Sequence, residues 1–327
     1  MNPPLLFQPS PDAVYGFPRA RLVERVESRY QTIEIWDTPQ LGALFTLDGR
    51  PMTSAGDEFI YHECMVHPAA LAHPAPRAAL VLGGGDGGAA RQLLKHPGIE
   101  RIVVAELDAE VVRLTRQYLP DVQGGAFDDP RVELVIGDAA DYVAALAAAT
   151  ATDAPANTTT KIAAAAPGAA REGTPQPASA TPPEAPRFDL VVFDLTPPDS
   201  PAAGLYTPAF YAQLKRVLSA DAALSLHLGS PYFHAPRIAG LLDDLRASFA
   251  HVRMLSTFVP LYGSLWTMAI ASATLDPAAL TATTLAERVA ARGIDSLRHY
   301  EPALHAGLFS ATRSVRDKLS PLPKLSR

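Results

Sequence analysis

The sequence predicts an α/β protein in which a small N-terminal β domain precedes a doubly wound parallel sheet with helices on both faces. Three observations lead to this fold class. Apolar and polar residues alternate early in the chain, as in strands; strand-like and helix-like segments alternate later; and a glycine-rich turn joins the first of these later strands to the first helix. With 327 residues the chain is long enough for both parts. We expect the domains to cover residues 1–60 and 61–327.

The N-terminal segment carries strand and turn signals rather than helical ones. Apolar and polar residues alternate there with a period of two, and a run of apolar residues ends at the turn Asp48-Gly49. The predicted strands cover residues 21–28, 32–36 and 44–47. An apolar stripe at helical spacing over residues 57–71 predicts a helix that leads into the large sheet.

Strands and helices then alternate along the rest of the chain. The predicted strands are residues 79–82, 102–105, 132–136, 190–193 and 223–228. The predicted helices are residues 89–95, 109–118, 139–149, 207–218 and 238–249. This alternation indicates a Rossmann-like parallel sheet, of the type found in methyltransferases, with its ligands at the carboxyl ends of the strands.

One segment interrupts this pattern. Residues 150–187 consist mainly of Ala, Pro and Thr, with hardly a large apolar side chain. Such a composition cannot bury enough surface to offset the entropy lost on ordering. We expect a disordered insert within the second domain.

The glycine-rich turn contains a carboxylate, Asp86, between glycines that satisfy the G-x-G-x-x-G spacing of a nucleotide-binding turn: Gly83, Gly85 and Gly88. Asp86 would repel the pyrophosphate of a dinucleotide, and also the carboxylate of S-adenosylmethionine. The decarboxylated form of S-adenosylmethionine carries only an ammonium on that arm, so it would find a partner in Asp86. Asp is also a favoured N-cap residue, and capping of the next helix is compatible with ligand binding.

Acidic residues end four successive strands of the predicted sheet: Asp86, Glu106, Asp138 and Asp194. Because the carboxyl ends of parallel strands meet at one edge, we expect these four side chains to face one cleft. Glu106 is placed to accept hydrogen bonds from ribose hydroxyls, and Asp138 from an adenine amino group. Asp194 is placed to accept a proton from an attacking amine.

Composition excludes several classes of function. The net charge of −6 and the isoelectric point near 5.8 argue against nucleic acid or an anionic membrane as the main partner. A single cysteine rules out an internal disulfide framework and favours a cytoplasmic location. His62 and His67 are five residues apart, whereas a zinc-binding helix of the His-Glu-x-x-His type needs four, so no metal is expected.

These motifs resemble those of the polyamine aminopropyltransferases, of which spermidine synthase is the usual member. The resemblance spans nearly the whole chain apart from the insert. It rests on residues 30–34 (YQTIE), 47–49 (LDG), 57–63 (DEFIYHE), 83–88 (GGGDGG), 106–108 (ELD), 128–132 (DDPRV), 205–207 (LYT), 210–211 (FY) and 260–266 (PLYGSLW).

The resemblance implies transfer of the aminopropyl group of decarboxylated S-adenosylmethionine to putrescine, which gives spermidine and methylthioadenosine. It implies no metal, no cofactor, and assembly as a homodimer or homotetramer. Asp194 matches the residue that accepts the proton of the amine, and Tyr61 and Tyr262 match tyrosines that orient it. The residues that match donor-binding positions are Gln31, His62, Asp86, Glu106 and Asp138.

The chain departs from the family pattern on the acceptor side of the pocket. Pro197 stands where a second Asp is usual, and Met52 and His227 each stand where a Gln is usual. Asp199 is a candidate to replace the missing acid. Three alternatives therefore stay open: a different or longer amine as acceptor, a small-molecule methyltransferase, which Asp86 disfavours, and a nucleoside-binding protein without turnover.

Overall fold

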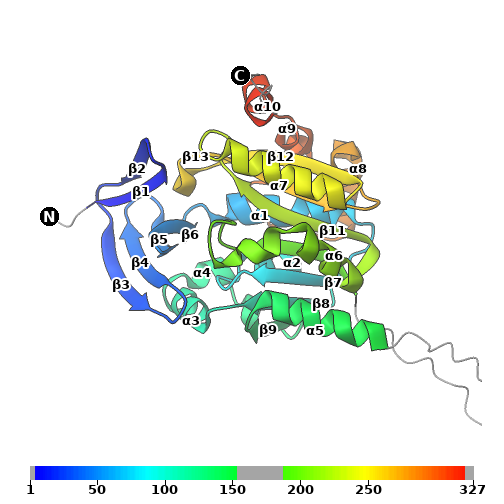
Figure 1. Ribbon diagram of the computed structural model, residues 1–327, viewed down its shortest axis with the longest axis horizontal. Coiled ribbons are helices and arrows are strands. Elements are labelled where there is room, and N and C mark those ends of the chain that lie inside the picture. Colours follow the sequence, from blue (N-terminus) through cyan, green and yellow to red (C-terminus); the bar gives the residue numbers. More distant parts are fainter. Residues whose placement is uncertain (1–3, 153–186, 321–327) are drawn as a thin grey trace, which may run out of the picture.

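The computed structural model describes residues 4–152 and 187–320. Two small antiparallel sheets at the N-terminal end stand beside a seven-stranded sheet with helices on both faces (Figure 1). The predicted fold class, a Rossmann-like sheet preceded by a small β region, is confirmed. The predicted boundary between residues 60 and 61 stays a prediction; the small sheets end at Ser54 and the first helix begins at Glu58.

The N-terminal sheets contain six strands, of which the sequence predicted three by range. The strands are β1 (Leu5–Ser10), β2 (Ala13–Phe17), β3 (Arg21–Glu27), β4 (Thr32–Thr38), β5 (Gly42–Leu47) and β6 (Arg50–Ser54). Strands β1 and β2 form one hairpin, and β3 to β6 form a four-stranded meander. The predicted turn at Asp48 and Gly49 is confirmed, with both residues in the left-handed region at φ values of 49° and 73°.

The large sheet has the order β12-β13-β11-β10-β7-β8-β9. Its strands are β7 (Ala78–Gly83), β8 (Arg101–Glu106), β9 (Val132–Ile136), β10 (Phe188–Asp194), β11 (Leu218–Gly229), β12 (His251–Val259) and β13 (Ser264–Ser272). Strands β7 to β11 pair in parallel as predicted, but β13 runs antiparallel to both of its neighbours. The short turn at residues 260–263 joins β12 and β13 as a hairpin, because a parallel pair needs a much longer crossover.

Six of the helices lie where the sequence predicted them, whereas α4, α8, α9 and α10 were not predicted. They are α1 (Glu58–Ala72), α2 (Gly88–Leu94), α3 (Ala109–Tyr118), α4 (Pro120–Gln123), α5 (Ala139–Thr152), α6 (Pro208–Leu214), α7 (Ala235–Ser248), α8 (Ala282–Ala291), α9 (His305–Leu308) and α10 (Arg313–Leu319). The predicted helix at 207–218 is too long, because a 3-10 turn follows Leu214 and β11 begins at Leu218. Within residues 4–152 and 187–320, no helix is long and apolar enough to cross a membrane.

The predicted insert at 150–187 begins inside α5, which continues to Thr152. Apart from residues 150–152 and Arg187, the insert lies outside the described residues, so its expected disorder stays a prediction.

Alternate residues of the central strands pack into two separate hydrophobic cores. Val81 and Val104 face the core that contains Met65 of α1 and Leu93 of α2. Their neighbours along the strands face the opposite core, which the side chains of α5, α6 and α7 complete. Helices therefore cover both faces of the sheet, and the carboxyl ends of the strands are the edge that is left for a ligand.

Helix α1 is buried almost throughout, and Glu63 in its middle binds the C-terminal part of the chain. The buried Glu63 carboxylate accepts hydrogen bonds from the backbone N–H groups of Arg298, His299 and Tyr300, the shortest at 2.8 Å. This contact gives Glu63 a structural role beside His62 in the sequence.

Glu63→Gln is expected to lower the free energy of unfolding by about 2–3 kcal/mol, because the amide –NH₂ would face backbone donors that need an acceptor. Urea denaturation measures this loss. Hydrogen exchange should show the amides of residues 298–300 opening first, whereas uniform protection across the chain would contradict the assignment.

Candidate active site

A cavity of about 590 Å³ lies at the carboxyl ends of the parallel strands, between the large sheet and the N-terminal β strands. All four strand-end acids line it: Asp86, Glu106, Asp138 and Asp194. The predicted convergence of these acids on one cleft is therefore confirmed. Such a volume accommodates a nucleoside together with a second small molecule.

The glycines of the turn after β7 make room for three functional side chains. Gly84 has a φ of +74°, donates its N–H to the Asp194 carbonyl at 2.9 Å, and lies where a Cβ would be 3.3 Å from the Asp194 carboxylate. A Cβ on Gly85 would lie 2.8 Å from the Glu106 carboxylate, and one on Gly88 would overlap the His62 imidazole. The glycines are thus required for the close approach of these side chains to the backbone, as well as for the turn.

Glu106 is a buried acceptor between two backbone donors. Its carboxylate oxygens accept the N–H groups of Gly85 at 3.0 Å and Asp108 at 2.9 Å. Burial outweighs these hydrogen bonds and raises the pKa of Glu106 to about 7. The carboxyl group therefore titrates near neutrality.

Because a ribose hydroxyl donates best to an ionised carboxylate, nucleoside binding should tighten as the pH rises through the Glu106 pKa of about 7. Between pH 6 and pH 8 the Kd of methylthioadenosine is expected to fall by about tenfold. Calorimetry in two buffers of different ionisation enthalpy should show close to one proton released at pH 6. A Kd that is constant over this range would contradict the role of Glu106.

His62 lies behind two of the cavity carboxylates. Its Nδ1 is 2.7 Å from Glu58 Oε2, and its Nε2 is 3.6 Å from both Asp86 Oδ2 and Asp194 Oδ2. Burial by itself lowers the pKa of His62, but the surrounding carboxylates raise it well above its usual value. His62 is therefore an imidazolium at neutral pH.

This placement changes the expectation for His62. The sequence predicted that it binds the donor, but it is only 1% exposed and is not among the residues that line the 590 Å³ cavity. Since it contacts Asp86 and Asp194 from behind, we expect it to position these carboxylates.

The same three residues bring potential metal ligands together. One ligand atom each from His62, Asp86 and Asp194 lies within 4.8 Å of the others. A protonated imidazole has no free lone pair for a metal, so the ion pairs oppose that use. The absence of a metal stays a prediction.

Asp86 stabilises the glycine turn through hydrogen bonds and also lines the cavity. Its Oδ1 accepts the N–H of Gly88 at the start of α2 at 2.9 Å, and its Oδ2 accepts the hydroxyl of Thr53 from β6. Burial raises the pKa of Asp86, while His62 opposes this shift. Thr53 was not predicted, because it reaches the site from a separate sheet.

Asp194 has a buried carboxylate oxygen, Oδ2, that lies 3.6 Å from the His62 imidazole but accepts no hydrogen bond among the described residues. The ring of Tyr61 lies 6.1 Å from that of Tyr262, and both line the same part of the cavity. Burial, and then the charge of Asp194, raise the pKa of Tyr61 well above its usual value, so its hydroxyl stays a donor.

Two further predicted donor-binding residues line the nucleoside end. Gln31 donates from Nε2 to Asp108 at 3.1 Å, which holds its amide at the cavity wall. Asp138 is exposed, and its Oδ1 accepts the N–H of Ala140 at 2.7 Å at the start of α5. Gln31 directly precedes β4 of the small sheet, and Asp138 follows the end of β9 of the large sheet. Their contacts with a ligand stay predictions.

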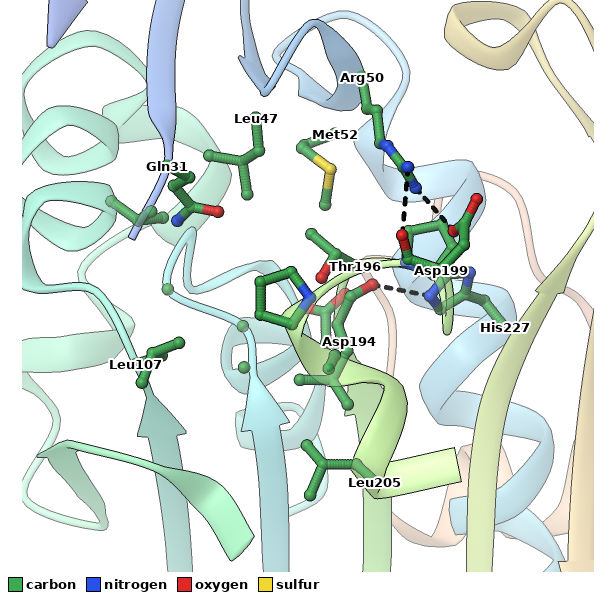
Figure 2. A pocket seen from close by; sticks show the side chains of 18 of the residues that line it. Gln31, Leu47, Arg50, Met52, Leu107, Asp194, Thr196, Asp199, Leu205 and His227 are labelled. Atoms are coloured by element: carbon green, nitrogen blue, oxygen red, sulfur yellow. Dashed lines mark hydrogen bonds and ion pairs between the residues drawn. The ribbon is translucent and has the colours of Figure 1, made fainter. Parts of the chain in front are cut away.

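The opposite end of the cavity contains the residues that depart from the family pattern. Figure 2 shows Gln31 on one side of Asp194 and His227 on the other, with Met52 above Asp194. Burial lowers the pKa of His227 to about 4, so its imidazole is neutral; its Nε2 lies 2.7 Å from the Leu195 carbonyl.

Asp199 is not free to replace the missing acid. Arg50 binds it at 2.7 Å and Arg237 lies 3.4 Å from the same oxygen. Neither arginine was predicted, because neither differs in its local sequence from an ordinary surface arginine.

Comparisons with known proteins agree with this site. The family model described as the spermine/spermidine synthase domain matches residues 58–160 and 179–280. The chain is 40% identical over 311 residues to the polyamine aminopropyltransferase of Nitrosomonas europaea, which covers 95% of this chain and 84% of that one. It is 33% identical over 289 residues to that of Thermoanaerobacter sp., with 88% of each chain covered.

Solved structures show the same fold. A spermidine synthase in complex with the transition-state analogue AdoDATO superposes with a TM-score of 0.75 at 27% identity, covering 94% of this chain and 90% of that one. Spermidine synthase from Thermotoga maritima gives a TM-score of 0.73 at 27% identity, with 94% and 89% covered. The extent of these matches, together with the site, establishes that the chain belongs to the spermine/spermidine synthase family of polyamine aminopropyltransferases.

Proposed function

We propose that this protein transfers the aminopropyl group of decarboxylated S-adenosylmethionine to a primary aliphatic amine. The observation that carries the proposal is Asp86, a buried carboxylate in the nucleotide-binding turn that lines the cavity. Asp86 belongs to a group of linked ion pairs in which three carboxylates, of Glu58, Asp86 and Asp194, face two cations, Arg91 and His62, which leaves one net negative charge. A donor arm that ends in an ammonium alone suits this charge.

The donor is proposed to lie along the strand ends. Glu106 accepts the ribose hydroxyls, Asp138 accepts the adenine amino group, and Asp86 accepts the ammonium of the aminopropyl arm. This places the sulfonium near Asp194, because Asp194 and the turn at Gly84 are in direct contact. The amine then occupies the part of the cavity beyond Asp194, near Tyr61.

The chemistry needs alignment and one proton transfer. The amine loses a proton to Asp194 and attacks the carbon next to sulfur, while the C–S bond breaks and its electron pair stays on sulfur as methylthioadenosine leaves. An alkyl ammonium has a pKa near 10.4, so only about one molecule in a thousand is reactive at neutral pH without a base. A sulfonium is already a good leaving group, so no cofactor is required.

Two alternatives are less well supported by the site. A methyltransferase would bring the carboxylate of intact S-adenosylmethionine against Asp86, and like charges in a partly dry site cost several kcal/mol. A nucleoside-binding protein without turnover would not need a cavity carboxylate whose oxygen, among the described residues, lacks a hydrogen-bond donor. The family resemblance favours putrescine as acceptor, and spermidine as product, so putrescine is the reference amine.

The test is product identification. Purified protein is incubated with decarboxylated or intact S-adenosylmethionine and a panel of amines, and the products are identified by mass. Methylthioadenosine and an aminopropylated amine should form with the decarboxylated donor only. Methylated products from the intact donor would instead establish the methyltransferase, and retained nucleoside without any product would establish the binding protein.

A further inference from the structure

The cavity has opposite charges at its two ends. The nucleoside end and the middle hold the carboxylates of Asp86, Glu106 and Asp194. The far end holds two guanidinium groups, Arg50 and Arg237, both of which line the cavity (Figure 2 shows Arg50). An acceptor whose amine reacts beside Asp194 therefore extends its other end toward these two guanidinium groups.

One carboxylate is shared between the two arginines. Asp199 Oδ1 lies 2.7 Å from Arg50 Nη1 and 3.4 Å from Arg237 Nη1. Arg50 and Arg237 are positive and Asp199 is negative. The adjacent His234 adds no charge, because burial lowers its pKa to about 4 and keeps it neutral. This end therefore carries one net positive charge. A second ammonium without an accompanying anion would be repelled by this charge, whereas a carboxylate on the acceptor would be attracted by it.

The far end also holds hydrogen-bond donors that lack acceptors. Among the described residues, Arg237 Nε and Trp266 Nε1 are buried without a hydrogen-bond partner, and both residues line the cavity. Each of these groups can only donate. Buried donors without acceptors are uncommon, so a ligand that supplies acceptor oxygens would complete this wall.

The backbone is shaped to hold Arg237 in this position. Gly229, at the end of β11, has a φ of +111°, and a Cβ there would lie 2.6 Å from Arg237 Nη2 and 2.8 Å from His234 Nδ1. Arg237 also donates to the Leu228 carbonyl at 3.4 Å. The guanidinium is therefore packed into the wall, with a side chain only 21% exposed, rather than free in solvent.

Resting on the aminopropyl transfer proposed above, we propose that the preferred acceptor is a diamino acid, whose carboxylate binds Arg50 and Arg237 while its terminal amine reacts beside Asp194. The carboxylate of such an acceptor compensates the net positive charge of this end, which a dicationic diamine cannot do. Met52 and Pro197 also line the cavity, and neither offers a side-chain carboxylate or amide to the ammonium of a diamine.

The reaction itself is unchanged. The terminal nitrogen forms a bond to the aminopropyl carbon, the C–S bond breaks with its electron pair on sulfur, and the nitrogen's proton passes to Asp194. The product is an N-aminopropyl amino acid together with methylthioadenosine.

Ornithine is the matched probe, because it is putrescine with one added carboxylate. The full-length enzyme is supplied with decarboxylated S-adenosylmethionine and with ornithine, putrescine or 4-aminobutanoate, and kcat/KM is measured from methylthioadenosine release. We expect ornithine to exceed putrescine by about tenfold or more, the effect of one charge-assisted hydrogen bond. Mass spectrometry identifies the aminopropylated product.

Variants separate the arginines from the rest of the site. Arg50→Gln and Arg237→Gln should each lower kcat/KM for ornithine by about tenfold and shift the ornithine-to-putrescine ratio toward putrescine. Arg50→Lys keeps the charge and should restore most of the ratio. Arg21→Gln, an exposed arginine paired with Asp37 outside the cavity, is the control and should leave the ratio unchanged. Thermal unfolding checks that each variant is folded.

The outcomes distinguish the two proposals. If putrescine is used better than ornithine, and the Arg50 variants do not move the ratio, the acceptor assignment is wrong while aminopropyl transfer stands. If none of the amines in the panel leads to release of methylthioadenosine, the proposal of aminopropyl transfer is wrong, and the acceptor assignment is wrong with it.

Discussion

Asp194→Asn is expected to reduce kcat by about a thousandfold while the Kd for methylthioadenosine changes less than about threefold. General-base catalysis contributes between about a hundredfold and ten-thousandfold. Asp194 Oδ2 is buried and accepts no hydrogen bond among the described residues, and an asparagine of the same shape keeps the backbone contact with Gly84 but cannot accept the proton. Single-turnover kinetics with the decarboxylated donor measures the chemical step directly.

A control for this variant lies at the other end of the same strand. Asp189 on β10 accepts the backbone N–H groups of Arg77 and Ala78, at 2.7 and 3.0 Å, far along the strand from the cavity lining. Asp189→Asn should cost stability but leave kcat unchanged. If Asp194→Asn instead weakens nucleoside binding strongly and keeps kcat, its role is binding and the assignment as base is wrong.

Asp86→Asn is expected to weaken binding of decarboxylated S-adenosylmethionine by about tenfold to a hundredfold. The substitution removes the charge that pairs with the donor ammonium, and a hydrogen bond to a charged group contributes about 1.5–3 kcal/mol. The asparagine carbonyl can still accept the N–H of Gly88, so the start of α2 is kept. The variant should also discriminate less between the decarboxylated and the intact donor.

Methylthioadenosine is the matched ligand for this variant, because it has the nucleoside but lacks the aminopropyl ammonium. Its Kd should change less than about threefold in Asp86→Asn. Equal weakening of methylthioadenosine and the donor would mean that Asp86 only shapes the turn. Titration calorimetry at a fixed pH of 8 keeps Glu106 mainly ionised during the comparison.

The sequence predicted those residues of the site whose position follows from the parallel direction of the strands. An acid at the end of a parallel strand must lie at the same edge of the sheet as its neighbours, so Glu106 and Asp138 could be placed from the sequence alone. The helix α3 was predicted at the bounds it has, because Asp108 caps it and its apolar face is regular.

Residues that reach the cavity from elsewhere could not be predicted in this way. Thr53 and Arg50 come from the N-terminal sheet, whose position against the large sheet depends on packing between distant segments. His62 was expected in contact with the donor, but its place behind two carboxylates depends on how α1 packs under the glycine turn. Local pattern carries no information on such contacts.

The antiparallel direction of β13 could not be predicted from the local sequence pattern either. Strand β13 is as apolar and buried as the parallel strands, so its sequence does not reveal its direction. The turn at Tyr262 and Gly263 decides it, and the same turn brings Tyr262 into the cavity, where its hydroxyl donates to the Met52 carbonyl at 2.8 Å.

A direct comparison of the two adenosyl donors on the wild-type protein tests most sharply whether the buried carboxylate in the glycine turn selects the ligand. Isothermal titration should give a Kd for decarboxylated S-adenosylmethionine at least about tenfold below that for the intact form, since only the intact form places a carboxylate against Asp86. Equal or tighter binding of intact S-adenosylmethionine would contradict the account.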